Sequence, residues 1–263
     1  MERRLTFDQN VIFYDKHRPT YGTEIYKDII DYSGFGPGKR AVEVGCGTGQ
    51  ATRPFLDAGG DVIVCEIGKN LAEYTRHKFS DYSNLDVRVM PYEDCGIEES
   101  TVDLVYAATA FHWVGNGDGG YPLARKMLKP GCTLACWWNN PCPMSANPAL
   151  YRDLQYFYKK YAPQLVSGYD EDSEKFEKWY IMRCVDINSF FYKYGYKEVQ
   201  FQMYYTHRTF SANDYFELLH TYSDHMNVPE EQRVALFDSV RETVEKYGGI
   251  TIKDRIDLHM GRK

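Results

Sequence analysis

Three glycines alternate with other residues in the segment V-E-V-G-C-G-T-G, at Gly45, Gly47 and Gly49. Because glycine has no Cβ atom, such a segment lets the backbone turn tightly and approach a ligand closely. Two acidic residues accompany it: Glu43 precedes the first glycine, and Glu66 lies at the end of the next apolar segment. A carboxylate at the second position can accept hydrogen bonds from both hydroxyls of a ribose. The pattern therefore predicts a site for a ligand that contains a nucleoside.

The spacing of the glycines separates two classes of ligand. A dinucleotide-binding turn has the pattern G-x-G-x-x-G, whose third glycine would fall where this chain has Gln50. The carboxylate of Glu43 would repel a pyrophosphate and attract an ammonium or sulfonium group. A tight strand-to-helix turn that binds no ligand is the other interpretation of the three glycines alone.

Apolar segments that alternate with helical patterns predict the elements around this turn. The predicted strands are 41–45, 61–67, 85–90, 102–110 and 132–138, and the predicted helices are 23–32, 48–58, 70–80 and 121–129. Asn70 and Glu73 have the spacing of a capping box at the start of helix 70–80. Strands that alternate with helices in this way form a parallel sheet with helices on both faces.

Two later segments, 196–210 and 248–263, predict strands that complete this sheet as an antiparallel edge pair. The residues predicted to share one face are Val199, Phe201, Met203 and Tyr205 in the first strand, and Ile256, Leu258 and Met260 in the second. The predicted fold class is therefore α/β. It consists of a Rossmann-like, seven-stranded, mostly parallel sheet with helices on both faces, the antiparallel edge pair and helical cap insertions.

We expect the 263 residues to form a single domain with several parts. Residues 1–32 form an N-terminal cap segment, and residues 33–140 form the half that binds the cofactor. Residues 141–183 and 211–247 are helical insertions. We expect them to cover the acceptor site, where the molecule acted on would bind, because open α/β sheets bind ligands beyond the carboxyl ends of their strands.

Two segments lack a regular pattern. Residues 139–148 hold three prolines and predict a loop. The acidic stretch 169–178 predicts a solvated face or a mobile lid.

Composition excludes several classes of function. The chain has 31 Lys and Arg against 37 Asp and Glu, a net charge of −6, and no basic cluster, which argues against a nucleic acid or an anionic membrane as partner. No segment approaches the roughly 18 uninterrupted apolar residues of a membrane span. The N-terminal segment lacks the apolar run of a secretory signal. We therefore expect a cytoplasmic enzyme that acts on a small molecule; the sequence does not indicate its oligomeric state.

The seven cysteines do not form a disulfide framework, because their number is odd and no pair has C-x-x-C spacing. We expect them to be buried, reduced thiols. Cys132, Cys136 and Cys142 could be imagined as a metal cluster, but no histidine has the spacing to complete it, so we predict no metal site.

The chain resembles the class I S-adenosylmethionine-dependent methyltransferases over about residues 7–138. The matching segments are 41–49, Glu66, Tyr92-Glu93-Asp94, Asp103-Leu104-Val105 and Leu128-Lys129-Pro130-Gly131. Two further segments are similar to the subgroup that contains the trans-aconitate and juvenile hormone acid methyltransferases: Ala110-Phe111-His112-Trp113 and Phe7…Tyr14-Asp15…Arg18-Pro19-Thr20-Tyr21.

The chain departs from the class pattern at two positions. Cys132 replaces a glycine that is usual after Pro130. Pro54 would have to lie near the first turn of helix 48–58, where its missing N–H is tolerated.

This resemblance implies S-adenosyl-L-methionine as the cofactor and carries roles over to individual residues. The implied cofactor-binding residues are Glu43 near the ammonium, Gly45, Cys46, Gly47 and Gly49 at the methionine part, Glu66 at the ribose, Ile67, Tyr92 and Glu93 around the adenine, and Ala107 through its carbonyl. The implied substrate-binding residues are Tyr14, Arg18, Tyr21, Phe111 and Trp113.

Two of the implied residues have open roles. His112 is the best candidate for a general base, since its ordinary pKa lies near neutral pH, but it could instead orient the acceptor. A carboxylate acceptor is already ionised and needs no base, which favours the orienting role for that substrate. Arg18 could pair with a carboxylate of the cofactor or of the acceptor, or it could be a solvated surface residue.

Three functions are compatible with these observations. The first is methyl transfer from S-adenosylmethionine to a small-molecule acceptor, with a carboxylate among the candidates. The second is a NAD-dependent dehydrogenase, against which the glycine spacing and Glu43 argue. The third is a non-catalytic module that binds a cofactor and docks a partner protein.

Overall fold

The computed structural model describes residues 3–142, 147–166 and 173–263, which divide into two compact units. Unit 1 comprises residues 1–18, 140–183 and 205–255. Unit 2 comprises residues 19–139, 184–204 and 256–263. Both predicted insertions, 141–183 and 211–247, fall in unit 1, whereas the predicted cap segment 1–32 is divided between the units after Arg18.

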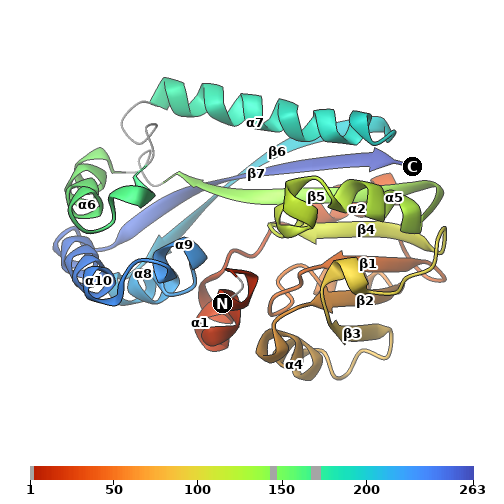
Figure 1. The fold of residues 1–263 in the computed structure, drawn as a ribbon, viewed down its shortest axis with the longest axis horizontal. Coiled ribbons are helices and arrows are strands. Elements are labelled where there is room, and N and C mark those ends of the chain that lie inside the picture. The colour runs from red at the N-terminus through yellow and green to blue at the C-terminus, as the bar shows by residue number, and fades with distance from the viewer. Residues whose placement is uncertain (1–2, 143–146, 167–172) are drawn as a thin grey trace. The chain divides into compact units, whose positions relative to one another are not determined.

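A seven-stranded sheet has the order β3-β2-β1-β4-β5-β7-β6 (Figure 1). Its strands are β1 Arg40–Val44, β2 Asp61–Glu66, β3 Leu85–Val89, β4 Val102–Ala108, β5 Leu128–Cys142, β6 Lys197–Phe210 and β7 Ile250–Arg262. Strands β1 to β5 pair in parallel. At the other side of β5, the Gly131 N–H donates to the Lys263 carbonyl (3.1 Å) and the Lys263 N–H donates to the Cys132 carbonyl (2.8 Å). The predicted sheet with its antiparallel edge pair is confirmed.

Strand β5 is longer than predicted at both ends. It begins at Leu128 and continues to Cys142, so residues 139–142 are strand and not loop. Prolines and asparagines disfavour strands, which is why the sequence predicted a loop here. The pairing of β5 with β4 ends at Trp137, so residues 139–142 extend β5 on the side of β7, its other neighbour in the sheet. Residues 143–146, the next part of the predicted loop, lie outside the described residues.

Helices of unit 2 lie close to their predicted positions, with two corrections. They are α2 Thr23–Ser33, α3 Arg53–Asp57, α4 Lys69–Lys78 and α5 Gly120–Met127. Helix α3 begins at Arg53, not at residue 48, because the glycine turn continues through Thr52; Pro54 thus lies in the first turn, where a missing N–H costs nothing. The capping box of Asn70 is wrong, since α4 begins after Gly68 and has no side-chain cap.

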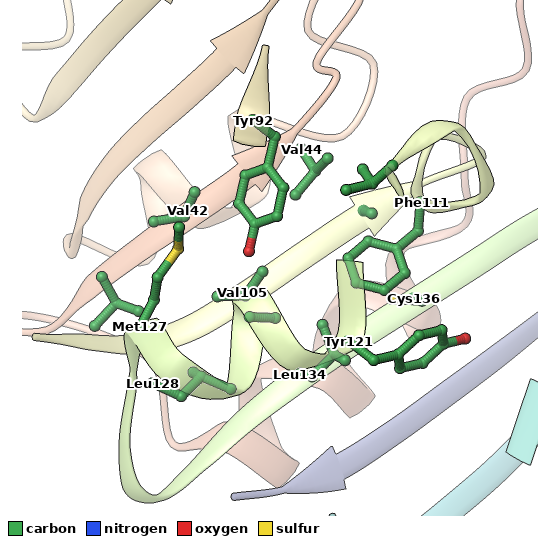
Figure 2. Packing of buried hydrophobic residues seen from close by; sticks show 14 of the residues in the cluster. Val42, Val44, Tyr92, Val105, Phe111, Tyr121, Met127, Leu128, Leu134 and Cys136 are labelled. Atoms are coloured by element: carbon green, nitrogen blue, oxygen red, sulfur yellow. The ribbon is translucent and has the colours of Figure 1, made fainter. Parts of the chain in front are cut away.

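Two apolar clusters cover the two faces of the sheet in unit 2. Figure 2 shows the first, in which Val42 and Val105 pack beneath Met127 of α5. The alternate strand positions, such as Ala41 and Leu104, belong to the second cluster. Successive side chains of a strand point to opposite faces, so a strand that is buried on both faces is apolar throughout. The second cluster also holds the predicted β7 residues Ile256, Leu258 and Met260.

Strand β6 has the predicted position in the sheet, but several of its residues are exposed. Phe201 is 40% exposed and Tyr205 is 55% exposed. Because β6 is the last strand of the sheet, alternation along it does not imply burial.

Unit 1 is mainly helical. Its helices are α1 Val11–His17, α6 Pro148–Tyr161, α8 Ala212–Leu219, α9 Ser223–Met226 and α10 Glu230–Lys246, with 3₁₀ turns η1 Arg3–Gln9 and η6 Pro163–Leu165. Helix α6 begins where the Asn147 side chain accepts a hydrogen bond from the Leu150 N–H (3.1 Å). Helices α6, α8 and α10 bury a common apolar cluster around Leu154, Leu218 and Val240. Within the predicted insertion 211–247, helix α8 ends at Leu219, and α9 follows it as a separate turn.

The helix α7 Ser173–Lys193 contains the end of the acidic stretch 169–178. Residues 169–172 and the side chains of 173–176 lie outside the described residues, so its role as a face or lid stays a prediction. In the described part of the chain, the helices are too short or too polar to cross a membrane.

Candidate functional site

The glycine turn follows β1 at the end of the sheet where the parallel strands finish. Gly45, Gly47 and Gly49 have φ angles of +64°, +59° and +79°, which side chains other than glycine rarely adopt. A Cβ atom at Gly49 would lie 2.3 Å from Cε2 of the buried Phe79 ring. This turn therefore requires glycine both for its backbone conformation and for space.

Glu66 fastens this turn to the end of β2. One carboxylate oxygen accepts a hydrogen bond from the Gly47 N–H (2.9 Å), and the other accepts one from the Gly68 N–H (2.8 Å). The side chain is buried. Each carboxylate oxygen has a second lone pair, so these bonds are compatible with the predicted contact to a ribose.

Glu43 lies within β1 and is fully buried. Its Oε2 atom accepts hydrogen bonds from the Thr52 hydroxyl (2.7 Å) and the Tyr106 hydroxyl (3.0 Å). Burial raises the pKa of this carboxyl from 4.5 to about 7, an effect that the two hydroxyls oppose and the nearby Glu66 charge reinforces. A carboxyl with such a pKa changes its charge readily when a cation binds near it.

The residues whose side chains support this turn were not among the predicted site residues. Tyr106 is the β4 partner of Glu43 in the sheet register, a relation that a correct alignment of the two strands would have shown. From α4, the Thr75 hydroxyl donates to the Gly47 carbonyl (2.9 Å) and the Lys78 ammonium donates to the Thr48 carbonyl (3.1 Å). These contacts join residues distant in sequence and leave no local signal.

Cys46 is buried beneath the turn, and its thiol lies 3.9 Å from the Thr75 hydroxyl oxygen. Burial raises the pKa of this thiol well above its ordinary value, so the group stays neutral. All seven cysteines are free thiols, as predicted, and six of them are buried, whereas Cys132 is half-buried.

The predicted adenine-binding residues have different environments. Ile67 is half-buried after β2, and Glu93 is exposed in the 3₁₀ turn η2 Tyr92–Asp94. The Tyr92 ring instead points into the core cluster (Figure 2). Its hydroxyl is buried and has no hydrogen-bond partner among the described residues. The Tyr92 side chain is thus part of the core, and only its backbone is left for the predicted contact with adenine.

The segment after β4 and the second half of β5 bring a second group of residues together. The Trp138 indole N–H donates to Nδ1 of His112 (3.0 Å), which lies in the 3₁₀ turn η3 Phe111–Trp113. The Thr109 hydroxyl oxygen accepts a hydrogen bond from the Asn139 N–H (3.1 Å) and lies 3.0 Å from the Tyr21 hydroxyl oxygen. His112 and Tyr21, both predicted site residues, therefore meet at the same pair of segments.

Three other predicted residues lie at the end of β4 or in the turn η3 that follows it. Ala107 is fully buried. Phe111 is also buried, and its ring packs edge-on against Tyr121 (5.0 Å between centroids; Figure 2). Its side chain is therefore part of the core cluster, and its contact with an acceptor stays a prediction. Trp113 is half-buried, with its ring 4.9 Å from that of His112.

Tyr14 and Arg18 lie in unit 1. The Arg18 guanidinium lies 5.3 Å from the Phe7 ring, 5.1 Å from the Tyr14 ring and 4.9 Å from the Tyr222 ring. Its Nη2 atom donates to the Thr221 carbonyl (2.5 Å), while its buried Nε atom has no hydrogen-bond partner among the described residues. Arg18 is therefore caged by aromatic rings and is not a solvated surface residue.

Two groups of described residues have donor atoms close enough to hold a metal ion. In the first, His17, Asp214 and Glu217, the Lys16 ammonium lies 3.0 Å from each acid and supplies the positive charge. In the second, Cys184, Asp257 and His259, the imidazole is hydrogen-bonded to Asp257 (3.0 Å). Neither group includes Cys132, Cys136 or Cys142.

Comparison with known proteins agrees with this architecture. Residues 42–136 match a family model described as a methyltransferase domain. An uncharacterized methyltransferase-like protein of Schizosaccharomyces pombe is 23% identical over 96% of this chain and 91% of its own length. An uncharacterized methyltransferase of Mycobacterium tuberculosis is 27% identical over 51% of this chain and 52% of its own.

A solved structure shares the fold. A protein from Anaeromyxobacter dehalogenans that has been assigned as a type II methyltransferase has a TM-score of 0.61 at 18% identity, over 93% of this chain and 97% of that chain. At this identity the likeness shows a common fold. Together with the matched domain and the relatives, it indicates a methyltransferase domain over residues 42–136 in a chain with a Rossmann-like fold.

Proposed function

We propose that this enzyme methylates a small molecule that carries a carboxylate, as in the trans-aconitate and juvenile hormone acid methyltransferase subgroup that it resembles. The observation that carries the proposal is the Arg18 guanidinium within a cage of aromatic rings, whose buried Nε donor finds no hydrogen-bond partner in the described part of the chain. A guanidinium so placed pairs well with a carboxylate. The carboxylate of a bound acceptor would balance the positive charge of the guanidinium, so an acidic side chain is not needed for this purpose.

S-adenosylmethionine fits the residues around the glycine turn. It supplies a methyl group on a positively charged sulfur, and it also carries an ammonium group and a ribose. Glu43 would lie near its positive charge, because this buried carboxyl gains from a cation. Glu66 would hold the ribose, and Gly45, Gly47 and Gly49 would let the backbone approach the methionine part.

Calorimetry and a turnover screen test this proposal. We expect the enzyme to bind S-adenosylmethionine and S-adenosylhomocysteine but not NAD. We also expect S-adenosylhomocysteine to form when small carboxylates are supplied, and not with phenols or amines. Binding of NAD alone would overturn the cofactor assignment, and turnover only with phenols or amines would overturn the acceptor class.

Substitution Glu66→Ala should weaken binding of S-adenosylhomocysteine by about 1–3 kcal/mol, because the charge-assisted hydrogen bonds to the ribose are lost. Isothermal titration measures the affinity, and thermal unfolding without ligand reports separately on the loss of the bonds to Gly47 and Gly68. The exposed Glu73 of α4 offers the control Glu73→Ala. Unchanged affinity in Glu66→Ala would remove Glu66 from the site.

A further inference from the structure

We infer that Trp138 is a positioning residue that fixes His112 with its proton on Nε2, so that His112 meets the acceptor as a hydrogen-bond donor and not as a general base. This inference rests on the proposed function for the identity of the acceptor site. The hydrogen bond between Trp138 and His112, on which the inference depends, does not require an acceptor.

The tautomer follows from the partner of Nδ1. An indole N–H can only donate a hydrogen bond, so Nδ1 of His112, 3.0 Å from the Trp138 Nε1 atom, must accept it. A neutral imidazole has one protonated nitrogen, and with Nδ1 as acceptor this nitrogen is Nε2. A base would need a lone pair directed at the acceptor, but the lone pair of this ring is directed at Trp138.

The segment that carries His112 is attached to β5 at more than one point. The Thr109 N–H donates to the Trp137 carbonyl (2.7 Å), and the Asn139 N–H donates to the Thr109 hydroxyl (3.1 Å). Thr109 has a φ angle of +54°, which is rare for a β-branched residue. Such a strained conformation persists only where the surroundings hold it, and it is common at functional sites.

Trp138 itself has little freedom to turn. The residue is buried, and its ring lies edge-on to the His259 ring with 5.9 Å between the centroids. His259 is fully buried and is hydrogen-bonded to both Asn188 (2.8 Å) and Asp257 (3.0 Å). The indole N–H is thus held toward His112, whose side chain is exposed at the end of the sheet.

This arrangement has a consequence for the reaction. An acceptor oxygen that is already ionised forms the bond to the methyl carbon with its own lone pair, while the carbon–sulfur bond breaks and its electrons stay on sulfur. The negative charge of the acceptor and the positive charge of the sulfonium cancel, and no proton is transferred. A hydrogen bond from Nε2–H positions this oxygen without needing to accept a proton.

Nuclear magnetic resonance of the ¹⁵N-labelled enzyme without ligands tests the tautomer directly. We expect the His112 ring to have a protonated Nε2 and an unprotonated Nδ1, and Trp138→Phe to give a mixture of tautomers. The His112 signals are assigned by their loss in His112→Gln. A protonated Nδ1 in the wild-type enzyme would overturn the inference whether or not any acceptor is methylated.

Kinetics of three variants test the role toward the acceptor. The amide of His112→Gln keeps a donor near the position of Nε2 but cannot act as a base, so kcat should stay within about threefold of wild type. His112→Ala and Trp138→Phe should raise the acceptor KM about threefold to tenfold, as expected for a weakened hydrogen bond. The exposed His77 supplies the control His77→Gln.

The outcomes separate this inference from the proposed function. If His112→Gln loses about 100-fold or more in kcat, as expected on removing a general base, His112 is that base and the inference is wrong. If no acceptor is methylated, the proposed function fails, while the ring signals still decide the tautomer.

Discussion

Replacing Gly49 by alanine is expected to lower the free energy of unfolding by about 2–4 kcal/mol and to impair binding of S-adenosylmethionine. The φ angle of +79° strains any residue with a Cβ atom. The new methyl group would also lie 2.3 Å from the Phe79 ring, which is buried beneath the turn. Both backbone strain and a steric clash destabilise this variant. The loss in free energy of unfolding should therefore exceed that of a glycine-to-alanine substitution that introduces only one of these effects.

Gly38 provides a matched control. It has a φ angle of +76°, but a Cβ atom there would meet nothing within 4 Å. Gly38→Ala should therefore cost only the backbone penalty, about 1–2 kcal/mol, and should leave ligand affinity unchanged. Urea unfolding of both variants isolates the clash with Phe79, and the second substitution Phe79→Leu should recover part of the loss in Gly49→Ala. Equal losses in free energy of unfolding for Gly49→Ala and Gly38→Ala would show that the turn accommodates the new methyl group without a clash with Phe79.

Local sequence signals predicted the strands and the turn correctly. Alternation of strands and helices implies a parallel sheet, and the three glycines mark a turn whose φ angles other residues rarely adopt. Errors arose where tertiary pairing outweighs local preference. Residues 139–142 extend β5 despite Pro141, and α3 begins only after the turn has ended at Thr52.

The directions of aromatic side chains could not be predicted from residue type. Tyr92 and Phe111 stand in segments that resemble cofactor and substrate motifs, but their rings point into the core. An aromatic ring serves equally well in a core and in a binding site, so only its packing decides between them. The aromatic cage of Arg18 was hidden for a related reason, since Tyr222 lies about 200 residues from it in sequence.

The electrostatic state of the site also depends on contacts between distant residues. The sequence placed an acid at Glu43 and predicted an attraction to a cation. It did not show that the acid is fully buried, nor that the hydroxyls of Thr52 and Tyr106 are its partners. Burial raises the pKa of this carboxyl to about 7 against the lowering effect of the two hydroxyls, and its charge therefore depends on what is bound.

Substitution Glu43→Gln should raise the stability of the ligand-free enzyme at pH 8 by up to about 3 kcal/mol and leave it nearly unchanged near pH 4.5. The pKa of this carboxyl is about 7 in the folded protein and 4.5 ordinarily. Between these values the folded protein keeps a proton that the unfolded chain has released, so the wild-type enzyme loses stability as pH rises through this window. Glutamine resembles the protonated acid and does not titrate, so the variant avoids this loss.

The same carboxyl should make ligand binding depend on pH. A sulfonium or ammonium group near Glu43 favours its ionised form, so binding below pH 7 releases a proton and wild-type affinity rises with pH, up to about tenfold per unit, until it levels off. The Glu43→Gln variant should bind S-adenosylmethionine more weakly at pH 8 and with less dependence on pH. Titration calorimetry in two buffers of different ionisation enthalpy measures the proton release, and Glu73→Gln, an exposed acid, serves as the control. If the wild-type enzyme releases no proton on binding, the positive charge of the ligand does not lie near Glu43.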